Sequence, residues 1–534
     1  MDKRTLLAVL LIFIVFWISS EFIWKRSQTT PEQQSVAETN TKELSTETSD
    51  PLSTKTTKQE VVQSPEVIQT DIDISNDIIL ENEVLKLRFS NLGALLHSIE
   101  IKAYLMADKQ TPVELLPVDE TLLGTKLQMA SGNISNLNNV PFQYRTEEDK
   151  VVFTAITANG TIEKSFYLGE GYQVDMQVDI NGNSELTGYE LQFNSGIADT
   201  EEYLKMKGRD YKIVSQADND LTKFTLNKLK ENREVNGKID WAAIKSKYFT
   251  IAVIPEDLID VNKLSAFKVQ DSPAMDLNIR TDRNNVSHNY QMYFGPLVYN
   301  NLEAYGNGVA SVVEMGPKWL QWISRGFMIF LKFLNSFIPS WGIVLIIFSI
   351  LLKIILYPLT HKSFESTTKM QKINPLVKEV QAKYKSDPQT MNAELKKLYK
   401  EHGVNPLGGC LPMLLQMPIL FALYPMLRYS IDLRQTHFLW LPDLSEPDPI
   451  WALPILMAVF MFVQQKLMAP SQQNVEGMDE KQKAAAQSQK MMMYFMPIMM
   501  FFIFKGLSSG LVLYWTVFSV IGSVQQYFIK KKFN

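Results

Sequence analysis

The residues of this sequence best suited to chemistry lie where hydrocarbon is expected. Lys353 stands in the apolar run "LLKIILYPLT" at 351–360, and a charged side chain at bilayer depth costs about 2.5–3.5 kcal/mol on insertion scales. Ser349, Lys353, Tyr357 and Thr360 follow one another at steps of four, four and three residues, which places them on one face of a helix. The lysine therefore serves a polar pathway or a partner, or it extends its ammonium to the membrane surface.

Other apolar segments carry polar faces of their own. Thr516, Ser519, Ser523 and Gln526 recur at offsets of three, seven and ten, and Gln416 and Gln464 lie in two further segments. Serine and threonine in membrane helices also bond to their own backbone or join helices, which is the structural alternative for any one face. Because polar groups in lipid must meet a partner or water, several such faces together indicate a shared polar cavity.

Covalent chemistry finds little support in the sequence. Ser349 and Lys353 are spaced as a serine and lysine dyad could be, but no glycine-rich segment nearby offers an oxyanion site. The single cysteine, Cys410, and five scattered histidines give no metal-ligand spacing. No phosphate-binding glycine loop is present. We therefore expect no catalytic residue, no metal and no cofactor, and the net charge of −4 gives no reason to expect direct nucleic-acid binding.

The N-terminal half divides into three parts. Residues 1–24 contain an apolar run long enough to span a bilayer, and because no small-residue cleavage site follows it, an uncleaved anchor is favoured over a signal peptide. Residues 25–70 are rich in Thr, Ser, Gln and Glu and predict a disordered tether. Residues 71–315 predict an antiparallel β-sandwich.

Period-two patterns carry the sandwich prediction. Apolar residues alternate with polar ones at Val174, Met176, Val178 and Ile180, as in a half-buried strand. An Asn-Gly pair at 159–160 is a hairpin signature, and the same pair recurs at 181–182 and 236–237. The weaker alternation of 219–235 predicts a loop or a short helix.

Residues 316–340 predict an amphipathic helix. Its basic and polar side chains share one face, and aromatic side chains fill the rest: Lys318, Gln321, Arg325 and Lys332 form the polar set. A basic, tryptophan-bearing helix favours the plane of the membrane interface. An ordinary docking helix is the alternative.

Five further apolar blocks complete six predicted spans. They are 341–360, 407–430, 450–469, 489–505 and 507–529, with connecting segments 361–406, 431–449 and 470–488 and a basic tail at 530–534. Residues 361–406 carry nine lysines, whereas 431–449 carry one basic residue, Arg434. Because lysine-rich loops stay in the cytoplasm, both chain ends and 361–406 are expected inside and the sandwich outside.

Two connecting features have patterns of their own. In 361–406, apolar residues follow helical spacing from Ile373 to Tyr384 and from Met391 to Leu398, with an N-cap and first-turn signal at Asp387-Pro388. A cytoplasmic helical hairpin is expected. The fifth span reads "MMMYFMPIMMFFIF" at 491–504, which suits a surface that accepts many apolar partners, or loose core filling.

Several motifs from Trp341 onward are similar to those of one family. They are "ILYPLT" (355–360), "NPLGGCLPMLLQMPILFALYPML" (405–427), "LRQTHFLWLPDLSEPDP" (433–449), "LPILMAVFMFVQQK" (453–466) and "SSGLVLYWTVFSVIGSVQQ" (508–526). They resemble the YidC/Oxa/Alb family of membrane protein insertases in its Gram-negative form. The resemblance implies a polytopic α-helical membrane protein with six transmembrane helices, five of them forming the insertase core, and a large antiparallel β-sandwich periplasmic domain.

The resemblance also implies a mechanism. In the family, a hydrophilic groove open to the cytoplasm and to lipid attracts acidic substrate segments with a basic residue, usually arginine, and the matching residue here is Lys353. Substrate segments then slide along apolar helices into lipid. The groove is expected to include Lys353, Ser349, Tyr357, Gln416, Thr516, Ser519 and Ser523, and the hydrophobic slide Met417, Met493, Met496, Met500, Tyr514 and Trp515.

The expected function is insertion, folding and assembly of inner-membrane proteins, alone or with the Sec translocon, without enzymatic activity. The implied partners are nascent membrane-protein substrates, the lipid bilayer, the Sec translocon (SecYEG and SecDF) and the ribosome through cytoplasmic loops. The implied location is the inner membrane, multi-pass, with both termini cytoplasmic. A secondary transporter is the rival class, although the internal repeat typical of transporters is not evident. A scaffold for the sandwich is a third, and it predicts that Lys353 can be changed freely.

Overall fold

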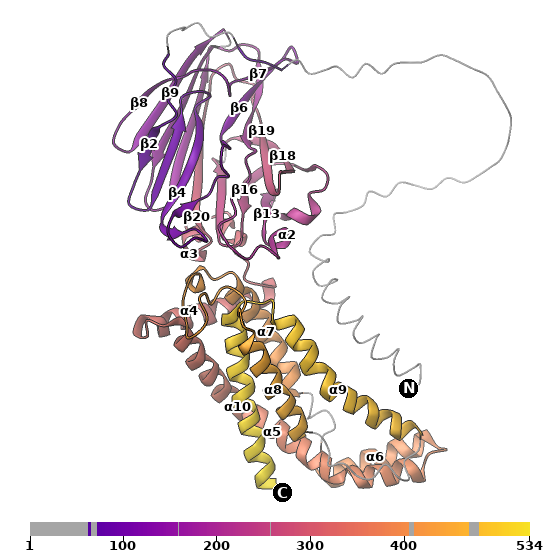
Figure 1. Ribbon diagram of the computed structural model, residues 1–534. Helices are drawn as coiled ribbons and strands as arrows, with labels where there is room; N and C mark the ends of the chain where they lie inside the picture. The colour runs from indigo at the N-terminus through magenta and orange to yellow at the C-terminus, as the bar shows by residue number, and fades with distance from the viewer. Residues whose placement is uncertain are drawn as a thin grey trace, which may run out of the picture. The chain divides into compact units, whose positions relative to one another are not determined.

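The computed structural model describes residues 62–65, 72–158, 160–256, 258–404, 411–468 and 480–533. The chain forms two compact units, Met1–Gly295 and Pro296–Asn534. Strands dominate the described part of the first unit, and helices dominate the second (Figure 1). The anchor predicted at 1–24 and most of the tether predicted at 25–70 lie outside the described residues.

Three β-sheets form the first unit. The seven-stranded sheet has the order β1 (Val62–Gln63), β7 (Ile134–Asn136), β6 (Gly124–Met129), β12 (Leu186–Phe193), β19 (Ser272–Arg280), β18 (Asp260–Val269) and β15 (Arg233–Asn236). The nine-stranded sheet has the order β14 (Asp220–Thr225), β13 (Lys212–Ala217), β16 (Ile239–Lys245), β17 (Phe249–Pro255), β20 (Val286–Pro296), β11 (Gln173–Asn181), β10 (Gly160–Leu168), β9 (Lys150–Thr157) and β8 (Gln143–Thr146).

The four-stranded sheet has the order β2 (Ile78–Glu81), β3 (Leu85–Ser90), β4 (Leu95–Leu105) and β5 (Pro112–Glu114). Two short helical turns, α2 (Lys207–Asp210) and η1 (Leu226–Lys228), interrupt the strands. The strand pairs whose register is described are antiparallel, apart from the short parallel pair of β1 with β7. The prediction of antiparallel sheets is therefore confirmed.

The period-two pattern that predicted a strand is borne out in β11. Val174, Met176, Val178 and Ile180 are buried, while the residues between them are half-buried. β11 pairs on one side with β10 and on the other with β20. A strand with one apolar face buries that face and leaves the other polar.

The three Asn-Gly turns behave differently from one another. Gly160, with φ of 103°, begins β10 opposite Thr157 of β9, so this pair of strands is the predicted hairpin. Gly182 and Gly237 also have positive φ, which glycine adopts without steric cost. They follow β11 and β15, however, and each of these strands lies in a different sheet from the strand after it. These two turns therefore carry the chain between sheets.

Two sequence expectations for this unit need correction. Residues 219–235, predicted to be a loop or a short helix, do contain the short helical turn η1, but β14 and the start of β15 lie on either side of it. Both are edge strands with little buried surface, so neither needs a strict apolar alternation. The sandwich also ends earlier than 315, because β20 ends at Pro296 and the following residues form α3 (Tyr299–Glu303) and η2 (Val309–Val312).

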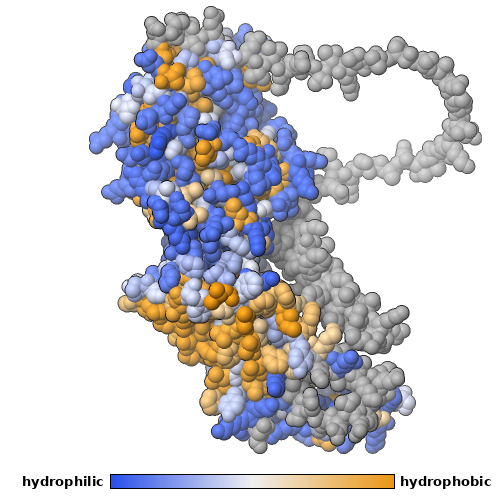
Figure 2. Space-filling view, viewed as in Figure 1, coloured by the Kyte–Doolittle hydropathy of each residue, from blue (hydrophilic) through white to orange (hydrophobic). Residues whose placement is uncertain are grey.

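The second unit is helical. Its remaining elements are η3 (Lys318–Leu320), α4 (Gln321–Phe337), α5 (Trp341–Lys383), α6 (Pro388–Glu401), α7 (Leu411–Arg428), η4 (Ile431–Leu433), α8 (Ala452–Met468), α9 (Glu480–Phe504) and α10 (Ser509–Phe533). Two of the described helices, Trp341–Lys383 and Ser509–Lys532, are long and apolar enough to cross a membrane. Ala452–Leu467 and Met493–Phe504 are shorter apolar helices. Figure 2 shows apolar side chains gathered over the helices of this unit.

Helix α5 is longer than the predicted span. It continues through Pro358 and Pro375 to Lys383, so the first arm of the predicted hairpin extends the same helix. A change in hydropathy marks where a membrane boundary is expected, but it does not end a helix. The second arm is α6, whose predicted N-cap is confirmed because Asp387 accepts hydrogen bonds from the backbone N–H groups of Gln389 and Thr390.

An apolar core lies at one end of the helical unit. Leu345 and Phe348 of α5, Leu423 of α7, Leu453 of α8 and Leu511 of α10 are among its buried members. Burial of such side chains contributes about 25 cal/mol per Å² of apolar surface. Leu331 of α4 and Phe504 of α9 also belong to this core, and the remaining turns of the helices carry the polar residues considered next.

Candidate functional site

Lys353 is buried between α5 and α10. Its side chain is 4% exposed, and Lys353 Nζ lies 4.0 Å from the centre of the Phe518 ring. Among the described residues, its ammonium has no hydrogen bond or ion pair. Since an unpaired buried charge is costly, the ring face is the one favourable contact observed for it within the described part of the chain.

Gly522 provides the space beside this ammonium. A methyl group placed on Gly522 would lie 3.2 Å from Lys353 Nζ and 3.1 Å from Gln464 Nε2. The head groups of a lysine from α5 and a glutamine from α8 therefore approach α10 at the same residue. A side chain larger than hydrogen would have to displace them.

A second face of α10 joins it to α8. Thr516, Ser523 and Lys530 are seven residues apart, and their side chains donate to the carbonyl groups of Leu453, Phe460 and Leu467, at 3.3, 3.0 and 3.3 Å. The two hydroxyls also lie within hydrogen-bond distance of carbonyls in their own helix. These contacts match the structural alternative, in which polar side chains join membrane helices.

Thr360 and Gln525 extend the polar contact between α5 and α10. Gln525 Nε2 donates to Thr360 Oγ1 at 3.1 Å. Gln525 Oε1 is buried and has no hydrogen-bond partner among the described residues. An unsatisfied buried acceptor is costly unless water or another donor reaches it. The α5–α10 contact is therefore a polar region with unused hydrogen-bonding capacity.

The remaining groove residues predicted on α5 differ in environment. Ser349 is fully buried and donates to the carbonyl of Leu345 at 2.6 Å. Tyr357 is 48% exposed and its ring stacks on His361. The structure thus does not bring Ser349, Lys353 and Tyr357 into one hydrogen-bonded group, although all three lie on α5.

Gln416 meets Tyr514 rather than Lys353. Gln416 Nε2 and the buried Tyr514 hydroxyl are 3.3 Å apart. Trp515, beside Tyr514, packs against Phe504 with ring centres 5.5 Å apart. This pair of aromatic residues therefore belongs to the contact of α10 with α7 and α9.

The methionines predicted for the slide are half-buried. Met417, Met493, Met496 and Met500 all have this intermediate exposure, and Met500 packs against the apolar core. The exposed large apolar side chains described on α9 are instead the following: Met491, Tyr494, Phe495, Ile498, Phe502 and Ile503. A large exposed apolar surface of this kind is typical of a lipid- or protein-binding face.

The buried residues of α5 and α10 change from mainly apolar to more polar about halfway along each helix. In α5 the buried residues are apolar up to Phe348 and Leu352 except for Ser349, and from Lys353 the buried set includes Thr360 and Ser363. In α10 the buried residues after Ser509 are apolar at 511–514, and those from Thr516 to Gln526 include Thr516, Ser519, Ser523, Gln525 and Gln526, before the apolar Ile529. The bundle is therefore apolar in its interior at one end and polar-lined toward the other.

Helix α4 exposes apolar side chains, and its basic residues face neighbouring segments. Lys332 Nζ lies 3.5 Å from a carboxylate oxygen of Asp432, and Arg325 lies 4.0 Å from Glu303. The exposed apolar set is Trp322, Ile329, Phe333 and Phe337 of α4, together with Trp319 of the preceding turn η3. The basic face expected from the sequence is thus partly used in ion pairs.

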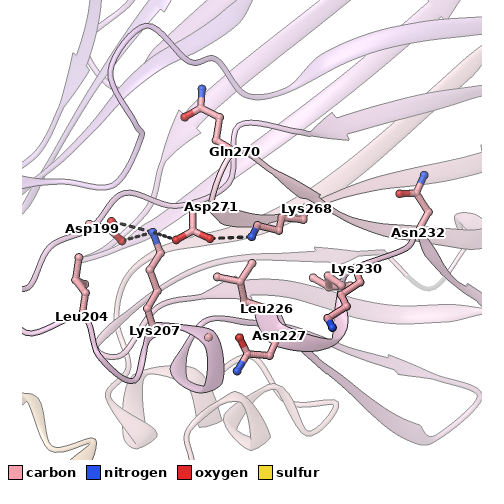
Figure 3. Close-up of a pocket in the computed structure, with 12 residues that line it drawn as sticks. Asp199, Leu204, Lys207, Leu226, Asn227, Lys230, Asn232, Lys268, Gln270 and Asp271 are labelled. Carbon is pink, nitrogen blue, oxygen red and sulfur yellow. Dashed lines mark hydrogen bonds and ion pairs between the residues drawn. The ribbon is translucent and has the colours of Figure 1, made fainter.

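A separate cleft of about 720 Å³ lies in the first unit. Figure 3 shows Lys207 between Asp199 and Asp271, with Lys268 also on Asp271. Lys268 and Lys207 hold the pKa of the Asp271 carboxyl below its usual value. Because these four charges pair with one another, the cleft offers no free ionic group among them, and we assign it no ligand.

The site residues predicted from the sequence do not include Phe518 and Gly522, the α10 residues beside the Lys353 ammonium. Phe518, Gly522 and Gln525 follow at steps of four and three and so share one face. A search for polar residues selects the neighbouring face with Thr516 and Ser523, because Phe518 and Gly522 are not polar. The signal available in the sequence was Gln525, a polar residue three positions after Gly522 and therefore on the same helix face.

Comparisons with known proteins identify the family. Residues 77–330 match the family model described as YidC periplasmic domain, and residues 333–534 match the model described as 60Kd inner membrane protein. A protein of Syntrophus aciditrophicus, named membrane protein insertase YidC, is 30% identical over 100% of both chains. A protein of Chlorobium luteolum with the same name is 34% identical over 70% of this chain and 67% of its own.

A crystal structure described as an active YidC insertase with its first transmembrane domain resolved was also matched. It aligns with 88% of this chain and 95% of its own at 18% identity, with a TM-score of 0.36. A score this low carries no argument about the fold. The two family models and the full-length relative are sufficient: the chain belongs to the YidC family, and is accordingly an inner-membrane protein with a periplasmic β-sandwich domain and no enzymatic activity.

Proposed function

We propose that this protein inserts, folds and helps assemble inner-membrane proteins through a hydrophilic groove that carries the positive charge of Lys353. The observation that best supports this is the change of α5 and α10 from an apolar interior at one end to a polar lining toward the other. Such a bundle is sealed where it is apolar. It can receive polar groups only from its polar end.

The membrane placement is part of the proposal. Residues 1–24, α5 up to residue 360, α7, α8, the apolar part of α9 and α10 would be six spans. The lysine-rich segment 361–406 and both chain ends would lie in the cytoplasm, because positively charged loops stay on that side. The polar end of the bundle would then open to the cytoplasm, and the apolar end would face the periplasm. Helix α4 would lie at the interface, with Trp319 and Trp322 toward lipid.

Lys353 would lower the cost of bringing a hydrophilic tail to bilayer depth. An isolated acidic side chain there costs about 2.5–3.5 kcal/mol. A buried ammonium at short range offsets this cost, since charges interact more strongly away from bulk water. Gln525, with an unused buried acceptor, would accept a hydrogen bond from a substrate N–H group. Neither step needs a cofactor.

Release would follow from the apolar part of the substrate. The exposed face of α9, with Phe495, Ile498 and Phe502, supports a slide along which a hydrophobic segment moves toward lipid. The half-buried methionines at 493, 496 and 500 would adapt to different segments. Burial of the segment in lipid, at about 25 cal/mol per Å², would drive the step. Sec translocon components and the ribosome are the proposed macromolecular partners beside the substrates.

Crosslinking tests the proposal against its rivals. A photoreactive residue at Gln416 or Met496 of the full-length protein in native membranes should capture nascent membrane-protein chains. An exposed lipid-facing position, Val459 on α8, provides the control. If the first two positions capture no nascent chain while reconstituted vesicles take up small solutes, a transporter is the better account.

A further inference from the structure

We infer that Phe518 is a positioning residue, which holds the ammonium of Lys353 inside the bundle in an orientation that leaves its N–H groups for a substrate carboxylate. This inference rests on the proposed function. It adds Phe518, which is not among the site residues predicted from the sequence and which packs against one of them, Tyr514, with ring centres 5.8 Å apart.

The geometry favours the ring as the resting contact. Lys353 Nζ is 4.0 Å from the Phe518 ring centre, well within the range of about 6 Å for a cation over an aromatic face. No hydrogen-bond acceptor for the ammonium is found among the described residues. A π face attracts the charge and receives at most a weak N–H···π contact, so most of the three N–H donors of the ammonium stay unused. The donors are therefore available to an incoming anion.

The alternative location for the ammonium is outside the bundle. The side chain of lysine is long and flexible, and lysines near helix ends extend toward water. Residues 353 and 360 are separated by about 10 Å along a helix, so only a modest shift toward the cytoplasmic end would move the charge into a wetter region. Phe518 opposes that shift, and Gly522 leaves room for the ammonium beside it.

The effect to be expected is moderate. A cation–π contact changes an equilibrium by roughly 2- to 30-fold, depending on how fully it is desolvated. Loss of the ring should therefore reduce the fraction of molecules with the ammonium in place by a factor in this range. The loss of the ring should slow the insertion of acidic substrates alone, because only their carboxylates interact with the Lys353 ammonium.

The test uses the full-length protein reconstituted in vesicles with two matched substrates. Their translocated tails carry either aspartates or asparagines at the same positions, and R is the ratio of the insertion rates of the acidic and the neutral substrate. Phe518→Leu, which keeps apolar volume, should lower R by about 2- to 30-fold. Phe518→Tyr and Phe518→Trp retain a ring face and should preserve R.

Controls separate positioning from structure. Insertion of the neutral substrate reports whether Phe518→Leu is folded and active, and Phe528→Leu, an exposed position on the same helix, should leave both rates unchanged. The double variant Lys353→Gln with Phe518→Leu should show no lower R than Lys353→Gln alone, because the ring acts through the lysine.

One outcome would overturn the inference: R unchanged in Phe518→Leu, whether both insertion rates are kept or both fall in the same proportion. Lys353→Gln distinguishes this failure from a failure of the proposed function. If Lys353→Gln lowers R and Phe518→Leu does not, only the role of Phe518 is refuted. If Lys353→Gln also leaves R unchanged, the charged groove itself is refuted.

Discussion

Replacing Lys164 by methionine should alter how the stability of the β-sandwich depends on pH. Lys164, on β10, is completely buried. Lys164 Nζ donates to the carbonyl groups of Gly93 and Leu123 at 3.0 and 2.9 Å. It thereby connects the nine-stranded sheet to the turn at Gly93 and to Leu123, the residue directly before β6. Burial lowers the pKa of Lys164 from 10.5 to about 7.

The sign follows from proton binding. Between about pH 7 and 10.5 the unfolded chain holds a proton on this lysine that the folded chain has released, so the free energy of unfolding rises with pH. The slope approaches about 1.4 kcal/mol per pH unit, and the full difference is about 5 kcal/mol. Below pH 7 both states are protonated and the slope from this group disappears. The neutral amine still carries two N–H donors for its two carbonyl partners.

The assay is urea denaturation of a fragment spanning residues 62–295, followed by far-ultraviolet circular dichroism at several pH values. Lys164→Met also removes the lysine donor from the Gly93 and Leu123 carbonyls, although Leu123 keeps a long contact with Thr125 Oγ1 at 3.5 Å; each lost bond costs up to about 1–3 kcal/mol at every pH. The diagnostic quantity is therefore the free energy of unfolding of the wild type minus that of the variant, which should increase from pH 7.5 to 9.5. A constant difference would refute the account of Lys164 as a buried, easily deprotonated amine.

Three further predictions concern single positions. Gly342→Ala should destabilise the helical unit by about 1–3 kcal/mol, because the added methyl would lie 2.1 Å from the Phe438 ring. Gly326→Ala is the control, because a methyl there meets nothing within 4 Å. Equal melting temperatures of the two variants in detergent would contradict the prediction. Asp387→Ala should destabilise α6 by about 0.5–2 kcal/mol through its lost N-cap bonds, and unchanged hydrogen exchange across 388–401 would speak against it. Burial, with a smaller contribution from the Glu190 carboxylate, raises the pKa of Asp276 to about 7, so its contribution to stability should be lost as pH rises from about 4 to 7; Asp276→Asn should remove that loss in urea denaturation, and an unchanged pH slope would count against it.

The sequence predicted those features that local chemistry decides. The alternation around Val174 and Met176 reflects a strand with one buried face, and Asp387 before Pro388 is a local signal that needs no tertiary context. The polar stripes of α5 and α10 were also visible, since hydroxyl and amide groups stand out in an apolar run. In these cases one periodicity or one motif carries the information.

Features that depend on packing between distant segments could not be predicted in the same way. The Asn-Gly turns before Gly182 and Gly237 look like hairpin turns, but strand pairing decides that they connect two sheets. The stripe of Thr516 and Ser523 contacts α8, and the adjacent face, with Phe518, meets Lys353. Which face of a helix meets which neighbour depends on the rotation of the whole bundle.

The central claim is that the charge at position 353 selects substrates by the charge of their translocated tails. Its most direct test measures insertion of substrates with acidic, neutral and basic tails by full-length proteins with lysine, arginine, alanine or glutamate at this position. We expect Lys353→Arg to keep the preference for acidic tails, Lys353→Ala to lose it and Lys353→Glu to reverse it toward basic tails. Equal insertion of all tails by all four proteins would contradict the account.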